Sequence, residues 1–158
     1  MSYEASPSSC QRRRDEAAAF IDGWAPWTHF LTGTYPGGRS PTVFNRDYRC
    51  FRDLLAAIGG DKHVPIAAAT GPQQSGTPHT HLLVAVPPTY QGDAARLMRR
   101  HWHRLTGGNA QVRRYSPARR AGMYMAGHHT WELDYACPRL GRCRRGPCML
   151  VTSSITLT

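Results

Sequence analysis

Two short apolar runs, at residues 63–70 and 79–86, constrain the fold of this chain more than any other feature. They read HVPIAAAT and HTHLLVAV, and the connection between them, GPQQSGTP, is rich in the Gly, Pro and Ser residues that form turns. Apolar runs of this length, bounded by turn residues, are typical of buried strands. We therefore expect two neighbouring antiparallel strands, and a sheet built around them.

The segments on either side of this hairpin alternate between strand and helix patterns. We expect a strand at 27–35 and a helix at 43–60 before the hairpin, then a helix at 94–105 and a strand at 109–115 after it. A last helix is expected at 117–129, with Ser116 as its cap and Pro117 at its first position. This order matches a split βαβ arrangement, an α+β fold of the ferredoxin or RRM type whose antiparallel sheet carries helices on one face. The other face is expected to be open for a ligand.

The length of 158 residues suits one domain. We expect a flexible N-terminal arm at 1–23, a compact domain at 24–130 and a Cys- and Arg-rich C-terminal tail at 131–158. No apolar run approaches the length of a bilayer span, and the first twenty residues lack a signal-peptide core. The sequence therefore predicts a cytoplasmic protein with no membrane partner.

The charge balance points to a polyanionic partner. Lys and Arg together number 20 against 10 Asp and Glu, which gives a formal net charge of +10, and Lys62 is the sole lysine. The planar guanidinium of Arg grips phosphate from two directions, so nucleic acid is the expected partner. Genomes of high GC content also favour Arg over Lys, but that preference does not explain the net charge.

His79 and His81 lie one residue apart in the second run of the hairpin, so a strand would place both imidazoles on one face of the sheet. This geometry suits two ligands of one metal ion. Ordinary core or surface histidines would give the same pattern. The apolar residues at 82–86 that follow predict a buried strand, which would hold the two side chains in fixed positions, as a functional site requires.

Three short motifs resemble a known family. Thr32, Gly33, Thr34 and Tyr35 form a Thr-x-Thr-aromatic pattern, SGTPHTHLLV contains the histidine pair after Gly-x-Pro, and Tyr124 to Gly127 partly match Tyr-x-x-Lys. Their order and spacing resemble those of the HUH endonucleases, in particular the rolling-circle replication initiators (Rep proteins). The resemblance covers residues 27–129, most of the chain.

This resemblance implies single-stranded DNA nicking and rejoining by metal-assisted tyrosine transesterification. His79 and His81 would hold Mg²⁺ or Mn²⁺ and Tyr124 would attack the phosphate, leaving a phosphotyrosine-linked 5′ end and a free 3′ hydroxyl. The reaction would initiate rolling-circle replication, mobilisation or transposition of a plasmid, phage or similar element. The domain at 24–130 would then be the nuclease, and a separate helicase would have to unwind duplex DNA.

The sequence departs from the family pattern at two positions. A glutamate that often serves as third metal ligand is replaced by Gly71, and Gln74, Gln73 or a water molecule would have to supply the oxygen. The lysine that follows the tyrosine by three residues is replaced by Gly127. His128, or the adjacent His129, is the expected substitute.

Other candidate site residues have ordinary alternatives. A tyrosine between two methionines, as Tyr124 is, is typical of a packed core position, and Tyr115 and Tyr135 are fallback nucleophiles. DNA phosphates would be bound by arginines on or beside the last two predicted helices, each of which would otherwise only aid solubility: Arg99, Arg113, Arg114, Arg119 and Arg120. Trp24, Trp27 and Tyr35 suit either base stacking or the core.

The C-terminal cysteines allow two readings. Cys137, Cys143 and Cys148 are either free thiols in a basic tail or ligands of a structural zinc ion, completed by His128 or His129. Two further functions stay open for the whole chain. One is a DNA-binding module of the same fold without catalysis, and the other is an RNA-binding domain.

Overall fold

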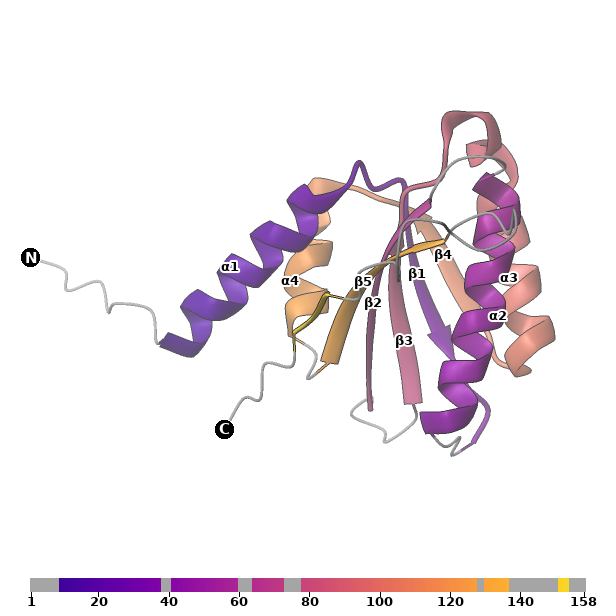
Figure 1. Ribbon diagram of the computed structural model, residues 1–158, viewed down its shortest axis with the longest axis horizontal. Helices are drawn as coiled ribbons and strands as arrows, with labels where there is room; N and C mark the ends of the chain where they lie inside the picture. Colours follow the sequence, from indigo (N-terminus) through magenta and orange to yellow (C-terminus); the bar gives the residue numbers. More distant parts are fainter. Residues whose placement is uncertain are drawn as a thin grey trace, which may run out of the picture.

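The computed structural model describes residues 9–37, 41–59, 64–72, 78–127, 130–136 and 151–153. Its strands form one antiparallel sheet in the order β4-β1-β3-β2-β5-β6 (Figure 1). The strands are β1 (His29–Thr34), β2 (Val64–Pro72), β3 (Pro78–Val84), β4 (Ala110–Arg114), β5 (Thr130–Ala136) and β6 (Val151–Ser153). The α-helices are α1 (Ser9–Trp24), α2 (Pro41–Gly59), α3 (Gln91–Thr106) and α4 (Ala121–Ala126), with 3-10 helices η1 (Pro88–Tyr90) and η2 (Pro117–Arg119).

The predicted hairpin is confirmed and forms the centre of the sheet. β2 pairs with β3 from Ile66 opposite Val84 to Pro72 opposite Pro78, and β1 pairs with the other side of β3. The order β4-β1-β3-β2, with α2 and α3 as the connections, is the split βαβ arrangement, so the α+β prediction is also confirmed. Because β3 has a partner strand on both sides, its side chains are held more firmly than those of an edge strand.

Helices α2 and α3 cover one face of the sheet, as expected (Figure 1). The apolar residues that repeat at helical spacing turn inward, with Phe51 and Leu55 from α2 and Met98 and Trp102 from α3 fully buried. They pack against alternate residues of the strands, including Leu31 and Leu82. No helix in the described part of the chain is both long and apolar enough to cross a membrane.

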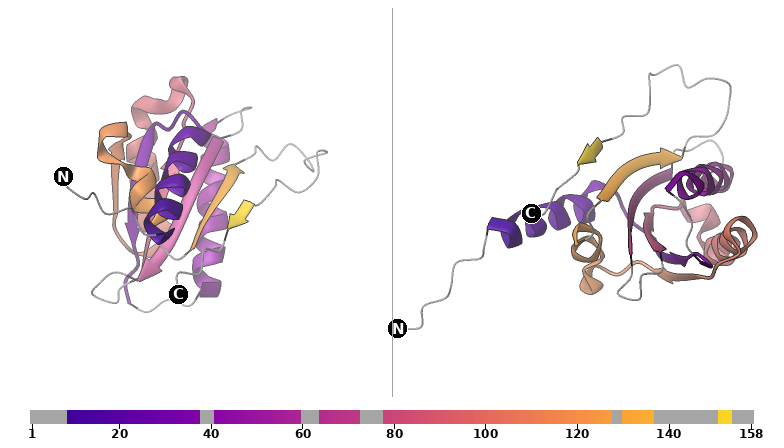
Figure 2. Two further views of the ribbon diagram at one scale, coloured as in Figure 1. Left: turned by 90° about the vertical axis from the view of Figure 1, so that its left-hand side faces the viewer. Right: turned by 90° about the horizontal axis from the view of Figure 1, so that it is seen from below.

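A second layer covers much of the face that was expected to be open (Figure 2). Residues 1–23 were predicted to be a flexible arm, but α1 begins at Ser9 and buries Ala17, Ala18 and Ile21 against the sheet and α4. The side chain of Trp27 then donates a 2.7 Å hydrogen bond to the Ile21 carbonyl, which fixes the turn into β1. Small residues on α1 let the helix lie close to the sheet, and for the same reason its sequence has no strong amphipathic pattern.

The domain also extends beyond residue 130, where the tail was predicted to begin. β5 pairs with β2 and β6 pairs with β5, and Leu133 of β5 is buried in the second layer. The three cysteines of the zinc hypothesis, Cys137, Cys143 and Cys148, lie outside the described residues.

The last predicted helix is shorter than expected. Pro117 begins the 3-10 helix η2, and Arg120 then adopts a left-handed conformation, with φ of 49°. This conformation interrupts the helix, so α4 begins only at Ala121. Ser116 precedes η2 but makes no side-chain capping hydrogen bond.

Substitution of Gly33 by alanine is expected to destabilise the fold by about 3 kcal/mol, because overpacking a buried position strains it. A Cβ at this position of β1 would lie 2.3 Å from the ring of Trp102, which is buried and cannot move aside. Thermal unfolding should show a drop of about 10 °C in Tm. Gly23→Ala is the matched control, since its Cβ meets nothing within 4 Å, and an unchanged Tm for Gly33→Ala would contradict the packing described.

Candidate active site

His79 and His81 lie side by side on the central strand, on the face covered by α1 and α4. Their ring centroids are 4.6 Å apart, and the residues are only 5% and 1% exposed. The alternation of a strand puts both rings on one face, as the sequence predicts. The structure therefore brings together two imidazoles in a sheltered position.

Tyr124 of α4 lies against His81, one member of this pair. Its ring meets His81 edge-on at a centroid distance of 4.6 Å. Phe30 of β1 lies beside both rings, parallel to His81 at 5.6 Å and edge-on to Tyr124 at 6.2 Å. Tyr124 remains 53% exposed, so it is not a packed core residue. The histidine pair and the tyrosine, separated by more than forty residues in the sequence, thus form one cluster open to solvent at Tyr124.

The neighbouring strands orient the histidines. Thr32 of β1 pairs with His81, and its hydroxyl oxygen lies 3.1 Å from Nδ1 of that ring, at hydrogen-bond distance. On the other side, Gly71 of β2 pairs with His79. The position where the family would carry a glutamate is therefore next to the pair, but it has no side chain to offer.

The third metal ligand expected from the sequence is not among the residues that the structure describes. Those residues contain no group of three or more His, Cys, Asp or Glu side chains that could hold a metal ion. The predicted ligand Gln74 and its alternative Gln73 lie outside the described residues, and so do His128 and His129.

The space beside Gly127 is occupied by Arg14 of α1. A Cβ at Gly127 would lie 2.6 Å from Nη2 of Arg14, and this same Nη2 donates a 3.3 Å hydrogen bond to the Met123 carbonyl. A guanidinium group therefore lies one helical turn after Tyr124, close to where the sequence lacks the lysine. It comes from the segment that was predicted to be an arm.

Asp22 of α1 holds the other end of α4. Its Oδ1 accepts a 3.0 Å hydrogen bond from the backbone N–H of Gly122 and a 2.9 Å hydrogen bond from the hydroxyl of Tyr115. Arg14 and Asp22 thus contact the two ends of the short helix that carries Tyr124. The same hydrogen bond commits the hydroxyl of Tyr115 to Asp22, which disfavours Tyr115 as the nucleophile.

Tyr115 is expected to ionise later than an ordinary tyrosine. Burial, followed by the hydrogen bond and the charge of Asp22, raises the pKa of Tyr115 to about 12 from a usual value of 10.0. The folded state holds the proton more tightly, so the associated stability is present below pH 10 and is lost as the pH rises through about 12. An ultraviolet difference titration of the native chain against Tyr115→Phe should show this late step, and Asp22→Asn should move it to lower pH. A Tyr115 step that stays near pH 10 in the native chain would contradict the contact.

Three of the predicted DNA-binding arginines line a cavity beside Tyr124. Its volume is about 310 Å³, and Arg113, Arg114 and Arg119 share its wall with Tyr124 and Thr32. The exposed Arg120 follows Arg119 at the start of α4. Arg99 lies instead on α3, which packs on the opposite face of the sheet, so it is not part of this surface.

Two aromatic residues considered for base stacking belong to the core. Trp27 and Tyr35 are buried, one in each of the two layers. Phe30, Asp22 and Arg14 were not identified from the sequence as site residues. Phe30 shares the alternation of β1 with Thr32 and was detectable by register alone, whereas Asp22 and Arg14 required the packing of α1.

Comparison of the chain with protein-family models, with curated proteins and with solved structures finds no match.

Proposed function

We propose that this protein nicks and rejoins single-stranded DNA, with Tyr124 as nucleophile. The observation that carries the proposal is the cluster of His79, His81 and Tyr124, in which the ring of His81 lies 4.6 Å from each of the other two rings. No local sequence pattern requires Tyr124 of α4 to contact His81 of β3, which lies more than forty residues earlier in the chain. Tyr124 is half exposed, so a polymer substrate can reach this residue from solvent.

We propose that the pair holds a divalent metal ion, Mg²⁺ or Mn²⁺, of which Mn²⁺ accepts nitrogen ligands more readily. Two imidazoles on one sheet face are nitrogen ligands, and Thr32 at Nδ1 of His81 would direct Nε2 of that ring toward the ion. When bound there, the ion would withdraw charge from a phosphate oxygen. With only two ligands identified, other oxygen atoms from protein, water or substrate would complete its coordination.

The covalent step would proceed from the hydroxyl of Tyr124. Its oxygen forms a bond to phosphorus while the bond from phosphorus to the 3′ oxygen breaks, the phenolic proton leaves to solvent, and the departing 3′ oxygen takes up a proton. The DNA 5′ end is then held as a phosphotyrosine diester. Attack by a 3′ hydroxyl reverses the step and rejoins the strand, so no nucleotide cofactor is consumed.

The charge around the tyrosine supports a nucleic-acid substrate. Arg113, Arg114 and Arg119 border the cavity beside Tyr124, where they would bind phosphates on either side of the attacked position. We propose that the substrate belongs to a plasmid, phage or similar element in the cytoplasm, and that a separate helicase exposes the single strand.

The decisive experiment is a search for the covalent intermediate. The protein is incubated with a pool of labelled single-stranded DNA and Mn²⁺, separated on a denaturing gel, and any slower band is digested and analysed by mass spectrometry. The proposal requires a nucleotide adduct on the peptide that contains Tyr124, lost on addition of EDTA. Single-stranded DNA binding without any adduct, over a pool that covers all short sequences, would replace it with the DNA-binding module. Tighter binding of RNA than of DNA would favour the RNA-binding alternative.

A further inference from the structure

The cavity beside Tyr124 borders the candidate active site. It lies between the edge strand β4 and the helix α4, and it shares Thr32 and Tyr124 with the histidine cluster. Thr32 contacts His81, so the wall of the cavity is one side chain away from the histidine pair. A part of the substrate bound in the cavity would therefore lie next to the bond that reacts with Tyr124.

The wall of the cavity contains positively charged arginines and uncharged polar and aromatic side chains, and its described residues include no carboxylate. Arg113 donates to the side-chain oxygen of Gln111 at 3.2 Å, and Arg114 donates to that of Gln91 at 2.8 Å. In the described part of the chain, neither these two arginines nor Arg119 forms an ion pair. Asp22, which accepts the hydrogen bond from Tyr115, does not line the cavity. Arg113 and Arg119 line the cavity, whereas the guanidinium of Arg114 is turned toward Gln91 at the start of α3. Two arginines at the wall of one cavity suit a phosphate.

The remaining wall is aromatic. Phe30, Tyr115 and Tyr124 contribute rings, two of which are fixed: Phe30 by its stack on His81 and Tyr115 by its hydrogen bond to Asp22. Aromatic rings of this kind stack on bases without regard to sequence. The volume of about 310 Å³ is at the small end of ligand pockets, enough for one nucleotide unit and too small for a base pair.

We infer that this cavity is a subsite for one nucleotide of the DNA strand, next to the phosphate that Tyr124 attacks. Arg113 and Arg119 bind the phosphate of this nucleotide, and its base lies among the aromatic rings with its edge toward Gln111. The strand enters and leaves over β4, which is the terminal strand of the sheet. This inference rests on the proposed function, because only the nicking reaction makes the neighbouring phosphate the one that is attacked. Binding of a nucleotide in the subsite requires neither a metal ion nor cleavage.

The test is a titration of the full ¹⁵N-labelled chain with the four 5′-deoxynucleoside monophosphates in EDTA, followed by NMR. Saturable shifts are expected at Gln111, Arg113, Tyr115 and Arg119. Deoxyribose 5-phosphate, which lacks the base, should bind at least about 10-fold more weakly, because base stacking contributes 1–3 kcal/mol. Arg113→Gln and Arg119→Gln should each raise the Kd for the mononucleotides about 10-fold.

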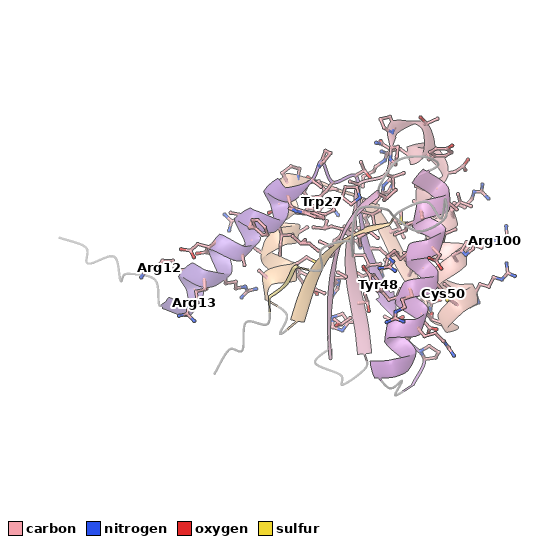
Figure 3. All side chains as sticks on the ribbon, in the orientation of Figure 1. Arg12, Arg13, Trp27, Tyr48, Cys50 and Arg100 are labelled. Carbon is pink, nitrogen blue, oxygen red and sulfur yellow. The ribbon has the colours of Figure 1, made fainter. Side chains whose placement is uncertain are left out.

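Arg100→Gln is the matched control, since it removes the same charge from α3, where Arg100 points away from the sheet (Figure 3). Its Kd should equal that of the native chain. The subsite is overturned if no signal saturates, if the sugar phosphate binds as tightly as the nucleotides, or if all three arginine variants weaken binding equally. Tighter binding of ribonucleoside monophosphates would overturn its assignment to DNA.

The outcome is independent of the nicking assay. A chain that binds nucleotides here but never forms an adduct keeps the subsite and loses the nuclease. A chain that forms the adduct without binding nucleotides here keeps the nuclease and loses the subsite.

Discussion

Replacing Tyr124 by phenylalanine is expected to abolish the covalent DNA adduct, with a loss of at least about 10⁴-fold in its rate of formation. The substitution removes only the hydroxyl, which is the attacking group in the proposed reaction. The ring that contacts His81 and Phe30 is retained, and the residue is half exposed, so the Tm should change by less than about 2 °C. Adduct formation on a denaturing gel measures the rate.

Tyr90→Phe provides the matched control. Tyr90 is also exposed, at 44%, but lies in η1 before α3, outside the histidine cluster. The Tyr90→Phe variant should form the adduct at the native rate. Both variants should bind single-stranded DNA with the affinity of the native chain. Persistence of the adduct in Tyr124→Phe would assign the chemistry to another residue, and the side chain found by mass spectrometry would identify it.

The central part of the fold was predictable because its signals are local. The hairpin of β2 and β3 follows from two apolar runs around a turn, and α2 and α3 follow from apolar residues at helical spacing that end at glycine. The placement of His79 and His81 on one face needs only the alternation of a strand. These elements supply both the predicted split βαβ arrangement and the rigid half of the candidate site.

The second layer was not predictable by the same reasoning. α1 packs through small residues such as Ala17 and Ala18, which leave little apolar periodicity, and α4 is limited to six residues by the left-handed Arg120. β5 and β6 lie in a segment whose Pro, Gly and Cys content resembles a tail, and their pairing depends on contacts distant in sequence. Tertiary packing, rather than local propensity, decides these elements.

The parts of the site that were missed depend on this second layer. Arg14 and Asp22 act on α4 only because α1 lies against it, and α4 and the segment before it form one wall of the cavity. Residues 74 and 128, predicted as metal ligand and lysine substitute, remain predictions outside the described residues. The side chain that the structure does bring beside Gly127, Arg14, comes from the opposite end of the domain sequence.

Loss of either histidine is expected to remove metal-dependent chemistry while leaving DNA binding in place. His79→Ala and His81→Ala should each reduce adduct formation by at least about 10²-fold, because polarisation of a phosphate oxygen by a metal contributes several kcal/mol. Mn²⁺ affinity, measured by electron paramagnetic resonance on the protein alone, should fall in parallel. Affinity for single-stranded DNA in EDTA should stay within about 3-fold of native, since the arginines around the cavity are unchanged.

Burial of His81 makes a folding control necessary. Alanine leaves a hole beside Phe30, so His81→Gln, which keeps most of the volume and a polar end, is measured with it, and Tm is determined for all variants. His101→Ala on α3 removes an imidazole outside the cluster and should leave Mn²⁺ binding and adduct formation at native levels. If folded His79 and His81 variants still form the adduct at the native, EDTA-sensitive rate, the metal is held elsewhere. The pair would then serve only to support Tyr124 through its contact with His81. The proposal that the two histidines of β3 bind the metal ion used by Tyr124 of α4 would be wrong.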